Sequence, residues 1–498
     1  MSHKHINKLM RTNNKLLVII LCLLAITGIS AKEYNASFFG IKQNGTTMNT
    51  SAIQRAIDYI HAEGGGTLVF AVGRYLTGTI YLKSDVTLRL KEGAVIVGSL
   101  NPYDYNVDNK LSAALIYAEG QNNIGIVGQG VIDGRGRELA YNIQDQIQKG
   151  VLKDELKNDR PGKYRPKCIY LRECKNVEIK GIFIKNSCEW VQTYDQCEQV
   201  KIDSISVESN AFWNNDGIDI VDCKHLKLLN SYVSAADDAI CLKSHDAKTF
   251  CDDVEIRNCT ARSGASGIKF GTVTSGGYKN IRIINNKVYD TFRSAITIAT
   301  PDGGNIENVV VDSLKAYHTG NAIFLRICNR WTNGRPVGIM NNITISNMYA
   351  EIAADKPDAG YDYEGPTEDQ PRNITPAAIM GIEGHDITNV TLKNIHLVFP
   401  GGGNPHFAYR GTKPADLDSI PEMEAKYPEF SQFKELPAWG FYIRHAQNVK
   451  FENVTLTAKE TDYRPAIVIQ QAKNISLKKV KYVEPGKKKQ QVVKYKTN

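Results

Sequence analysis

Apolar and polar residues alternate in a short phrase that returns along most of the chain. The phrase starts with a polar residue, usually Asn or Asp, and continues with apolar residues at every second position, as in "NVEIKGIFIK" from Asn176 and "NVTLKNIHL" from Asn389. Alternation with a period of two is typical of β-strands. From Asn176 to Asn308 the copies follow one another at steps of 23, 26, 28, 27 and 28 residues. A repeat of this length indicates stacked coils.

The phrase returns in the same sense each time, so successive strands should run parallel. A sandwich would place hairpin turns between the copies, and a leucine-rich repeat would need its own Leu/Asn consensus and a helix in each repeat. The pattern therefore predicts an all-β fold, a right-handed parallel β-helix whose coils lie about 4.8 Å apart. Residues 50–65, "TSAIQRAIDYIHAEGG", have apolar residues at helical spacing. We expect them to form a short helix that caps the first coil.

Later copies of the phrase are farther apart. Beyond Asn308 the steps lengthen to 34, 47 and 59 residues before returning to 26. Insertions leave a coil stack at its surface turns. We therefore expect long loops at about 349–388 and 399–447, which wall a cleft.

The first 31 residues differ from the rest. Four basic residues precede the uncharged run "LLVIILCLLAITGI", and small residues follow it. This order is typical of a secretory signal. A retained membrane anchor is the alternative, because the run is only slightly short for a membrane span. We expect a signal peptide over 1–31 and a single parallel β-helix domain over 32–498, secreted or periplasmic and without stable membrane insertion.

The distribution of charge argues against a nucleic-acid partner. The formal net charge is +8, and the four basic residues of the signal contribute +4 of it. From Lys473 onward nine Lys stand against one acid, a net +8, so the body between these ends carries about −4. The Lys-rich end solvates the chain terminus or loosely attracts an acidic polymer.

Nine of the ten cysteines lie after the predicted signal, and none is spaced as CxxC. An odd number leaves at least one thiol free. Because Cys also behaves as a small buried hydrophobe, we expect core packing with one or two disulfides, no metal site and no cofactor.

Acidic residues recur one coil apart. "NNDGIDIVDC" places Asp216 at one strand, and "SAADDAICLKSHD" places Asp237 and Asp238 at the next, 21 and 22 residues later. One coil without insertions puts Asp216 beside this pair on one sheet face. Neighbours on a regular strand point to opposite faces, so the chain should bend at Ala235 and Ala236 for both acids to reach the cleft.

Carboxylates this close repel one another, so at least one should have a raised pKa and stay protonated near neutral pH. A protonated acid beside ionised carboxylates can hydrolyse a glycosidic bond, because one group protonates the leaving oxygen while another activates water. The alternatives for such a group are a calcium site and a solvated cluster of acids at strand ends.

The order of these motifs resembles glycoside hydrolase family 28, the polygalacturonases and related pectin hydrolases. "NxDGxD" followed one short coil later by "DDxxxxKS" carries the resemblance, together with "GQGVIDGRG" and the stretch from Ser51 to Ser99. It extends from about residue 36 to 480. The resemblance implies an inverting hydrolase on a pectin-lyase-like β-helix, without a cofactor, that cleaves α-linked galacturonic acid in pectic polysaccharide.

The resemblance also implies roles for single residues. Asp237 matches the family's general acid, and Asp216 and Asp238 match the two carboxylates that hold and activate water. Asn214 matches the Asn of the first motif, which borders the substrate. The implied partner is an acidic plant polysaccharide or oligosaccharide, and we expect a monomer.

Two motifs depart from the family. Ser266 stands where the family has the His of Gly-His-Gly, and Thr297 and Ala299 stand where it has the Arg and Lys of Arg-Ile-Lys. Those basic residues normally grip the substrate carboxylate. Lys269 and Arg326 adjoin apolar strands and are the leading replacements, with a solvated surface role as the alternative. The full set of candidate cations is Lys269, Arg293, Arg326 and Arg330.

Three other functions stay open on these residues. The first is a hydrolase of the same fold that acts on another acidic or sulfated polysaccharide. The second is a polysaccharide lyase, which would need Ca²⁺ and an Arg or Lys base. The third is a non-catalytic glycan-binding β-helix. Saturated products and insensitivity to chelators would exclude the lyase, and loss of turnover with retained binding in Asp237→Asn would exclude the binder.

Overall fold

The computed structural model describes residues 32–106, 113–153, 164–210, 212–355, 357, 375–404, 406, 410–486 and 490–497. The predicted signal over 1–31 lies outside these residues, as do 356 and 358–374 of the first predicted loop. No helix in the described part of the chain is long and apolar enough to cross a membrane.

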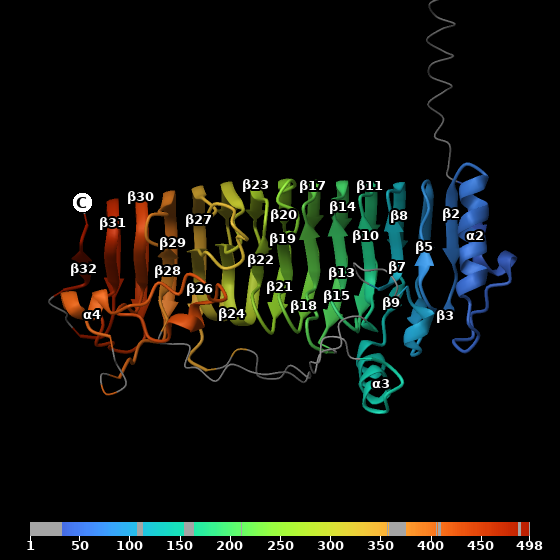
Figure 1. Ribbon diagram of the computed structural model, residues 1–498, viewed down its shortest axis with the longest axis horizontal. Coiled ribbons are helices and arrows are strands. Elements are labelled where there is room, and N and C mark those ends of the chain that lie inside the picture. The colour runs from blue at the N-terminus through green and yellow to red at the C-terminus, as the bar shows by residue number, and fades with distance from the viewer. Residues whose placement is uncertain are drawn as a thin grey trace, which may run out of the picture.

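The strands wind into a right-handed parallel β-helix, which confirms the predicted fold class (Figure 1). Each strand pairs in parallel with the equivalent strands of the coils before and after it. Equivalent strands thereby form three long sheets along the axis, which we call the repeat sheet, the middle sheet and the site sheet.

The three sheets differ in which part of each coil they contain. The repeat sheet, where the recurring phrase lies, consists of β1 (Glu33–Asn35), β2 (Gly66–Phe70), β5 (Val86–Leu90), β8 (Asn122–Gly128), β11 (Lys175–Lys180), β14 (Glu198–Asp203), β17 (Lys224–Leu229), β20 (Cys251–Arg257), β23 (Gly277–Ile284) and β25 (Asn305–Asp312). The middle sheet consists of β3 (Gly73–Thr77), β6 (Ala94–Gly98), β9 (Val131–Asp133), β12 (Phe183–Lys185), β15 (Ser206–Ser209), β18 (Tyr232–Ala235) and β21 (Thr260–Ser263). The site sheet consists of β4 (Ile80–Tyr81), β7 (Ala114–Glu119), β10 (Lys167–Arg172), β13 (Gln192–Asp195), β16 (Ile218–Val221), β19 (Ile240–Ser244), β22 (Ile268–Thr274), β28 (Ala377–Met380) and β32 (Val492–Tyr495). Long strands of the later coils pass around a corner from one sheet into the next; these are β24 (Lys287–Thr300), β26 (Lys315–Ile327), β27 (Met340–Ile352), β29 (Ile387–Phe399), β30 (Phe441–Ala458) and β31 (Ile467–Val483).

The polar residue that opens each phrase has a conformational role. In every copy this residue adopts a left-handed φ, between 52° and 59°. Asn and Asp tolerate this region better than other residues with a side chain. The Asn side-chain amides also bond from coil to coil; for example, Asn308 Nδ2 donates to Asn280 Oδ1 at 3.1 Å, and Asn342 Nδ2 donates to Asn308 Oδ1 at 2.8 Å. The recurring Asn therefore turns the corner into the repeat sheet.

Apolar residues of successive phrases stack inside the coil. Val200 lies in register with Leu226, and Ile202 with Leu228, and all four are buried. The open N-terminal end of the stack is covered by α2 (Thr50–Ala62), as the helical spacing predicted. Its buried face consists of Ile53, Ala56, Ile57 and Ile60.

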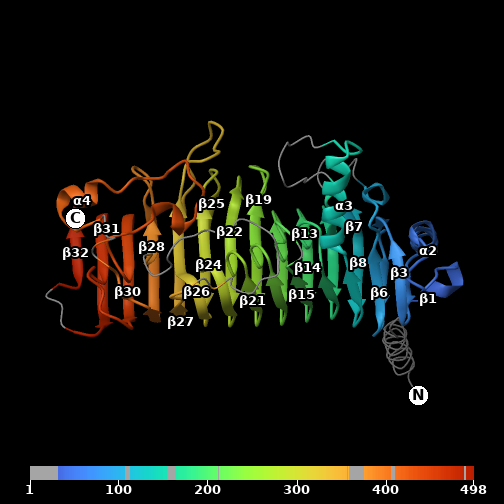
Figure 2. The ribbon, with the colours of Figure 1, turned by 90° about the horizontal axis from the view of Figure 1, so that it is seen from below.

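Two further helices rise on one side of the solenoid. Figure 2 shows α3 (Gly136–Gln148) and the segment around α4 (Pro414–Asp418) on the same side, with β19 between them along the axis. Short 3₁₀ turns are η1 (Ala36–Phe39), η2 (Pro102–Asp104) and η5 (Phe430–Phe433).

The loops and cysteines differ from expectation. β27 continues to Ile352, and β28 and the start of β29 fall inside the predicted loop at 349–388, because strands on either side of an insertion keep their pairing. β30 likewise begins at Phe441, inside the predicted loop at 399–447. All nine described cysteines are buried and free, so the expected disulfides are absent from the described residues.

Candidate functional site

The three predicted acids lie on adjoining coils at the edge of the site sheet. Asp216 comes just before β16, and Asp237 and Asp238 lie in the turn between β18 and β19. The backbone N–H of Gly217 donates to the carbonyl of Asp238 at 2.9 Å, so Asp216 and Asp238 are neighbours across one coil step. The spacing of the sequence predicted this juxtaposition.

The bend at Asp237 arises from a turn rather than from a distorted strand. β18 ends at Ala235 and β19 begins at Ile240, so the two acids are outside both strands and the alternation of faces does not apply to them. Asp237 Oδ1 accepts a hydrogen bond from the backbone N–H of Asp238 at 3.0 Å. Asp237 is half-buried, whereas Asp238 is buried.

Lys243 on β19 bridges two buried carboxylates. Its Nζ lies 2.8 Å from Asp216 Oδ2 and 2.8 Å from Asp219 Oδ1. We did not assign a role to Lys243 or Asp219 from the sequence, although both belong to the quoted motifs. The signal was the spacing: Asp219 pairs in register with Cys241, two residues before Lys243, so the outward faces of β16 and β19 bring these residues together.

The surroundings shift the pKa values of Asp216 and Asp238 in opposite directions. Burial, together with Asp219, Asp237 and Asp238, raises the pKa of Asp216 well above its usual value against the attraction of Lys243. Burial would also raise the pKa of Asp238, but Lys269, Arg293 and Lys243 lower it below the usual value. A raised pKa was expected within the group, and Asp216 carries it. The role of Asp237 as general acid stays a prediction.

Lys269 faces outward from the solenoid, because its neighbour Phe270 points inward into the hydrophobic core. Its Nζ lies 3.0 Å from Asp238 Oδ2 and 3.1 Å from Glu429 Oε1. It also donates to Tyr427 Oη at 2.9 Å. Lys269 is completely buried, so these groups enclose its charge.

A segment far away in the chain covers this part of the site sheet. We call residues 414–438, which include α4 and η5, the cover loop. Its apolar side chains Leu417, Ile420, Phe430, Phe433 and Leu436 pack on the outward residues Phe324, Ala378, Tyr442 and Val468 in a second hydrophobic cluster. The sequence predicted a wall of the cleft here but not which residues it would bring to the acids.

Arg326 lies beneath the cover loop. Its Nη1 donates to the carbonyl of Gly381 at 3.0 Å, its Nη2 donates to the carbonyl of Glu422, and its guanidinium lies 5.0 Å from the ring centroid of Phe433. Arg326 is 1% exposed. The structure thus places it as an anchor of the loop, and its predicted contact with substrate stays a prediction.

The remaining candidate cations are placed differently. Arg293 lies at the edge of the acid group, with Nη1 3.5 Å from Glu429 Oε1 and a side chain that is 21% exposed. Arg330 forms an ion pair with Asp302 at 3.0 Å and is not joined to the three acids by any ion pair of the described residues.

Two of the three positions that depart from the family, Ser266 and Thr297, carry hydroxyls, and the third is Ala299. The backbone N–H of Ser266 donates to Asp238 Oδ1 at 3.0 Å, so its main chain helps to hold that acid. The side-chain oxygens of Ser266, Ser294 and Thr297 are buried and have no hydrogen-bond partner among the described residues. The cation that pairs with Asp238 is instead Lys269, three residues beyond Ser266.

On the other side of the acids the site is aromatic and basic. The half-buried ring of Trp190 has Lys243 Nζ 4.5 Å from its centroid and Lys167 Nζ also at 4.5 Å. Asn214 Oδ1 accepts a hydrogen bond from Arg165 Nη2 at 3.1 Å. An exposed part of an indole beside carboxylates can stack on a sugar ring, which suits a carbohydrate cleft.

A divalent metal ion fits this group poorly. Among the described residues, ligand atoms of Asp216, Asp238 and Cys241 lie within 4.8 Å of one another. Lys243 and Lys269 already neutralise the two carboxylates, and a thiol is not a ligand that Ca²⁺ prefers. The chemistry of the group favours proton transfer.

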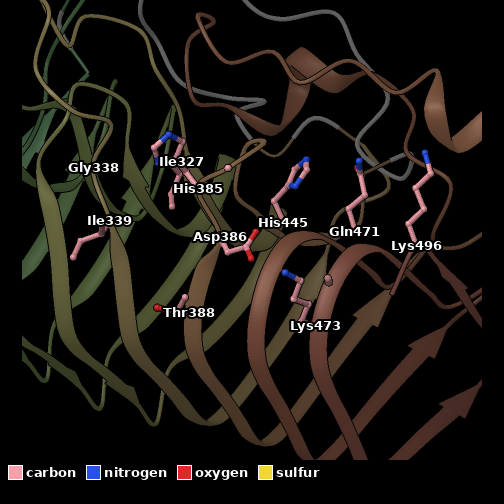
Figure 3. Close-up of a pocket in the computed structure, with 12 residues that line it drawn as sticks. Ile327, Gly338, Ile339, His385, Asp386, Thr388, His445, Gln471, Lys473 and Lys496 are labelled. Carbon is pink, nitrogen blue, oxygen red and sulfur yellow. The ribbon is translucent and has the colours of Figure 1, made fainter. Parts of the chain in front are cut away.

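A separate cavity of about 590 Å³ lies at a corner of the last coils, away from the three acids. Figure 3 shows His385, His445, Gln471 and Lys496 pointing to the same side, with Asp386 between them. Two of these side chains already have partners, because His445 Nε2 lies 3.0 Å from Glu422 Oε1 and Lys496 Nζ lies 2.8 Å from Asp418 Oδ1. None of the predicted site residues lines this cavity.

Comparison with known proteins links this geometry to carbohydrate hydrolysis. The sequence profile of glycosyl hydrolases family 28 matches residues 68–352, more than half of the chain. An exo-poly-α-D-galacturonosidase of Dickeya chrysanthemi is 27% identical over 304 residues, which cover 52% of this chain and 50% of that protein. The chain thus spans about half the length of this relative.

Solved structures agree on the fold. The family 28 exopolygalacturonase of Yersinia enterocolitica superposes with a TM-score of 0.60 at 20% identity, over 94% of this chain and 78% of that one. A surface adhesin of Streptococcus pneumoniae superposes with a TM-score of 0.56 at 15% identity, over 88% of this chain and 92% of that one. Because an adhesin has the same fold, function has to be argued from the site.

Proposed function

Because this chain belongs to glycosyl hydrolase family 28, we propose that it hydrolyses α-linked galacturonic acid residues in pectic polysaccharide. The observation that carries the proposal is the grouping of Asp216, Asp237 and Asp238 on adjoining coils, where two of the acids are buried against lysines and the third is half-exposed. Such unequal surroundings allow one carboxyl to donate a proton while the others accept one.

The proposed reaction is a single displacement. Asp237, which meets no cation within ion-pairing distance among the described residues, donates its proton to the leaving glycosidic oxygen. Asp216 and Asp238 hold a water on the opposite face of the sugar and take up its proton as its oxygen bonds to the anomeric carbon. The glycosidic bond breaks, and the new hydroxyl has the opposite configuration. A raised pKa makes Asp216 the stronger base once it is ionised.

The site supports action on chain ends or short oligosaccharides. Tyr427 and Glu429 of the cover loop lie over Lys269 and limit the cleft on the C-terminal side of the acids. α3 rises on the same face of the solenoid, on the N-terminal side of the acids (Figure 2). We propose an exo mode on this basis, and the printed names of the relatives from Dickeya and Yersinia are consistent with it.

Recognition of the uronate carboxylate remains part of the proposal. Lys269 and Arg326 are the predicted partners, but both are enclosed by the cover loop and would need to be uncovered by its movement. Arg293 is partly exposed and lies closer to the open cleft. We also propose that the predicted signal directs the protein to a secreted or periplasmic location, where plant polysaccharide would be met.

Hydrolysis of a panel of pectic polymers and oligomers tests the proposal. We expect galacturonic acid to be released, and proton NMR of fresh product should detect the inverted anomer first. Asp216→Asn, Asp237→Asn and Asp238→Asn should each lower kcat by about 10²-fold or more, the usual worth of a positioned acid or base. Asp252→Asn, on the repeat sheet, is the matched control. An initially retained anomer, or near-normal turnover in one of the three variants, would contradict the assigned roles.

A further inference from the structure

We propose that Glu429 is a further carboxylate of the site, a positioning residue that shares Lys269 with Asp238 and so tunes Asp238 as an acceptor of protons. The inference deepens the proposed function and rests on it, since Asp238 needs tuning only if it handles a proton. Glu429 belongs to none of the motifs of the sequence, and it approaches the acids only through the cover loop.

The contacts make Lys269 a shared cation. Its ammonium lies between Asp238 Oδ2 at 3.0 Å and Glu429 Oε1 at 3.1 Å. Glu429 is 1% exposed and also lies 3.5 Å from Arg293 Nη1. Charges this deeply buried are stable only when they are paired. The geometry therefore couples the two carboxylates through one lysine.

The position of Glu429 is fixed by packing. It directly precedes η5, and the flanking Phe430 and Phe433 are buried in the second hydrophobic cluster. Tyr427, two residues earlier, accepts hydrogen bonds from Lys269 Nζ at 2.9 Å and from Thr272 Oγ1 at 2.6 Å. The loop thus presents its carboxylate to Lys269 from a rigid support.

Glu429 partly offsets the cations that surround Asp238. Three cations lower the pKa of Asp238 and would make it a weak base if nothing opposed them. Glu429 opposes two of these cations, because it contacts both Lys269 and Arg293. The charged or titratable groups that face Asp238 from its own turn and from neighbouring elements are Asp216, Asp219, Asp237, Cys241, Lys243, Lys269, Arg293, Tyr427 and Glu429.

Opposite substitutions should shift Asp238 in opposite directions. Glu429→Gln removes a negative charge and leaves Lys269 to Asp238 alone, so the pKa of Asp238 should fall. Lys269→Met removes the attracting cation, so that pKa should rise, by about 1–3 units if the effect equals that of a single nearby opposite charge. A merely structural role would not produce opposite signs.

The shift can be measured without turnover. A carboxyl with a lowered pKa stabilises the fold above its unfolded pKa, and this contribution is lost as pH falls through the folded pKa. We would measure Tm from acidic to neutral pH for each protein and for the same protein carrying Asp238→Asn. The difference isolates Asp238. Its stabilising contribution should be lost at lower pH in Glu429→Gln. In Lys269→Met, where burial without the cation raises the pKa above that of the unfolded chain, ionised Asp238 should instead destabilise the fold, so the difference should reverse sign.

Two further variants keep the test decisive. Lys269→Met leaves Asp238 and Glu429 facing each other, so Lys269→Met/Glu429→Gln provides a charge-balanced version if the single variant does not fold. Glu422→Gln is the matched control, because Glu422 anchors the same loop through Arg444 and through His445 at 3.0 Å and forms no ion pair with Lys269 among the described residues. It should leave the pH of the loss unchanged.

Kinetics provide the second readout. Glu429→Gln should lower kcat about tenfold with KM changed less than twofold, a smaller loss than that of a base itself. An unshifted Asp238 in Glu429→Gln, or an equal shift in Glu422→Gln, would overturn the inference. If the Tm differences shift as expected but no pectic substrate is cleaved, the proposed function fails while the coupling of the two carboxylates stands.

Discussion

At the scale of single residues, the acids of the cleft depend on two buried lysines. Lys243 lies between Asp216 and Asp219, and Lys269 lies between Asp238 and Glu429. Removing one partner from a buried ion pair leaves an uncompensated charge, which costs much more than the pair itself contributes. Each lysine therefore controls both the stability and the protonation of its own acids.

Lys243→Met should change the pH dependence of turnover. Lys243 is the cation that holds the pKa of Asp216 down against burial and three neighbouring carboxylates. Without it the pKa of Asp216 should rise further, so Asp216 would stay protonated to higher pH and fail as a base. We expect the acidic limb of kcat/KM to move up by about 1–3 pH units. The measurement is a pH–rate profile on the substrate that the panel identifies.

Lys167→Met is the comparison for this change. Lys167 lies as close to the ring of Trp190 as Lys243 does, but it pairs with Glu189 at 2.6 Å instead of with Asp216. Its removal should leave the acidic limb in place. An equal displacement in both variants would mean that general electrostatics, and not the Lys243–Asp216 pair, determines the limb.

The acids and the candidate cation Lys269 could be predicted from the sequence, whereas the loop residues that share this cation could not. One coil separates Asp216 from Asp238, so a count of residues was enough to bring them together. Tyr427 and its neighbour Glu429 reach Lys269 across a separation of about 158 residues through a loop of no regular period. The contacts of Arg326 could not be predicted either, because Glu422 and Phe433 belong to that loop; its contact with substrate stays a prediction.

At the scale of elements, the recurring strand depends on its first residue. The corner needs a left-handed φ there, which costs a residue with a Cβ about 1–2 kcal/mol unless its side chain bonds locally. Asn308, with φ 58° and amide bonds to Asn280 and Asn342, fulfils both conditions. The repeat period could be predicted from the sequence because this one requirement recurs in every coil.

Substitution of Asn308 separates the cost of its left-handed φ from the contribution of its amide hydrogen bonds to stability. Asn308→Ala should lower the free energy of unfolding by about 1–2 kcal/mol, because it keeps the unfavourable φ and loses the amide. Asn308→Gly should cost less, because glycine adopts this φ without strain and loses only the amide bonds. Urea unfolding followed by circular dichroism would compare the two. Equal losses would assign the whole effect to the amide ladder and none to the backbone.

At the scale of the whole molecule, the open edges at the two ends of the solenoid are protected in different ways. α2 covers the first coil, whereas in the described residues only Ile467–Gln470 of β31 have a further strand, β32, beside them. The rest of β31 presents an unpaired edge that carries Lys478 and Lys481, both exposed. Lysine on an edge strand opposes the addition of another strand. The basic end noticed in the sequence thereby acquires a structural role.

Removing those charges should promote self-association. Lys478→Val/Lys481→Val replaces two exposed cations on the open edge by β-branched residues that favour strand pairing. We expect the mass from light scattering to rise with protein concentration, while the parent protein stays a monomer. Lys450→Val, on a strand that is paired on both sides, is the matched comparison and should not associate. A double variant that stays monomeric at every concentration would assign the protection of this edge to something other than charge.

The cover loop has one more consequence, for how disorder spreads along the stack. A solenoid unfolds locally from its ends, because each coil contacts only its neighbours. The cover loop breaks this rule: Asp418 binds Lys496 beside the final strand, Leu417 accepts a hydrogen bond from Gln470, and Glu429 binds Lys269 several coils earlier. The cover loop therefore links the last coils directly to the coil that carries Lys269. Loosening of β32 would therefore be transmitted to Lys269, and a ligand that stabilises the cover loop over the acids would also stabilise the C-terminal coils.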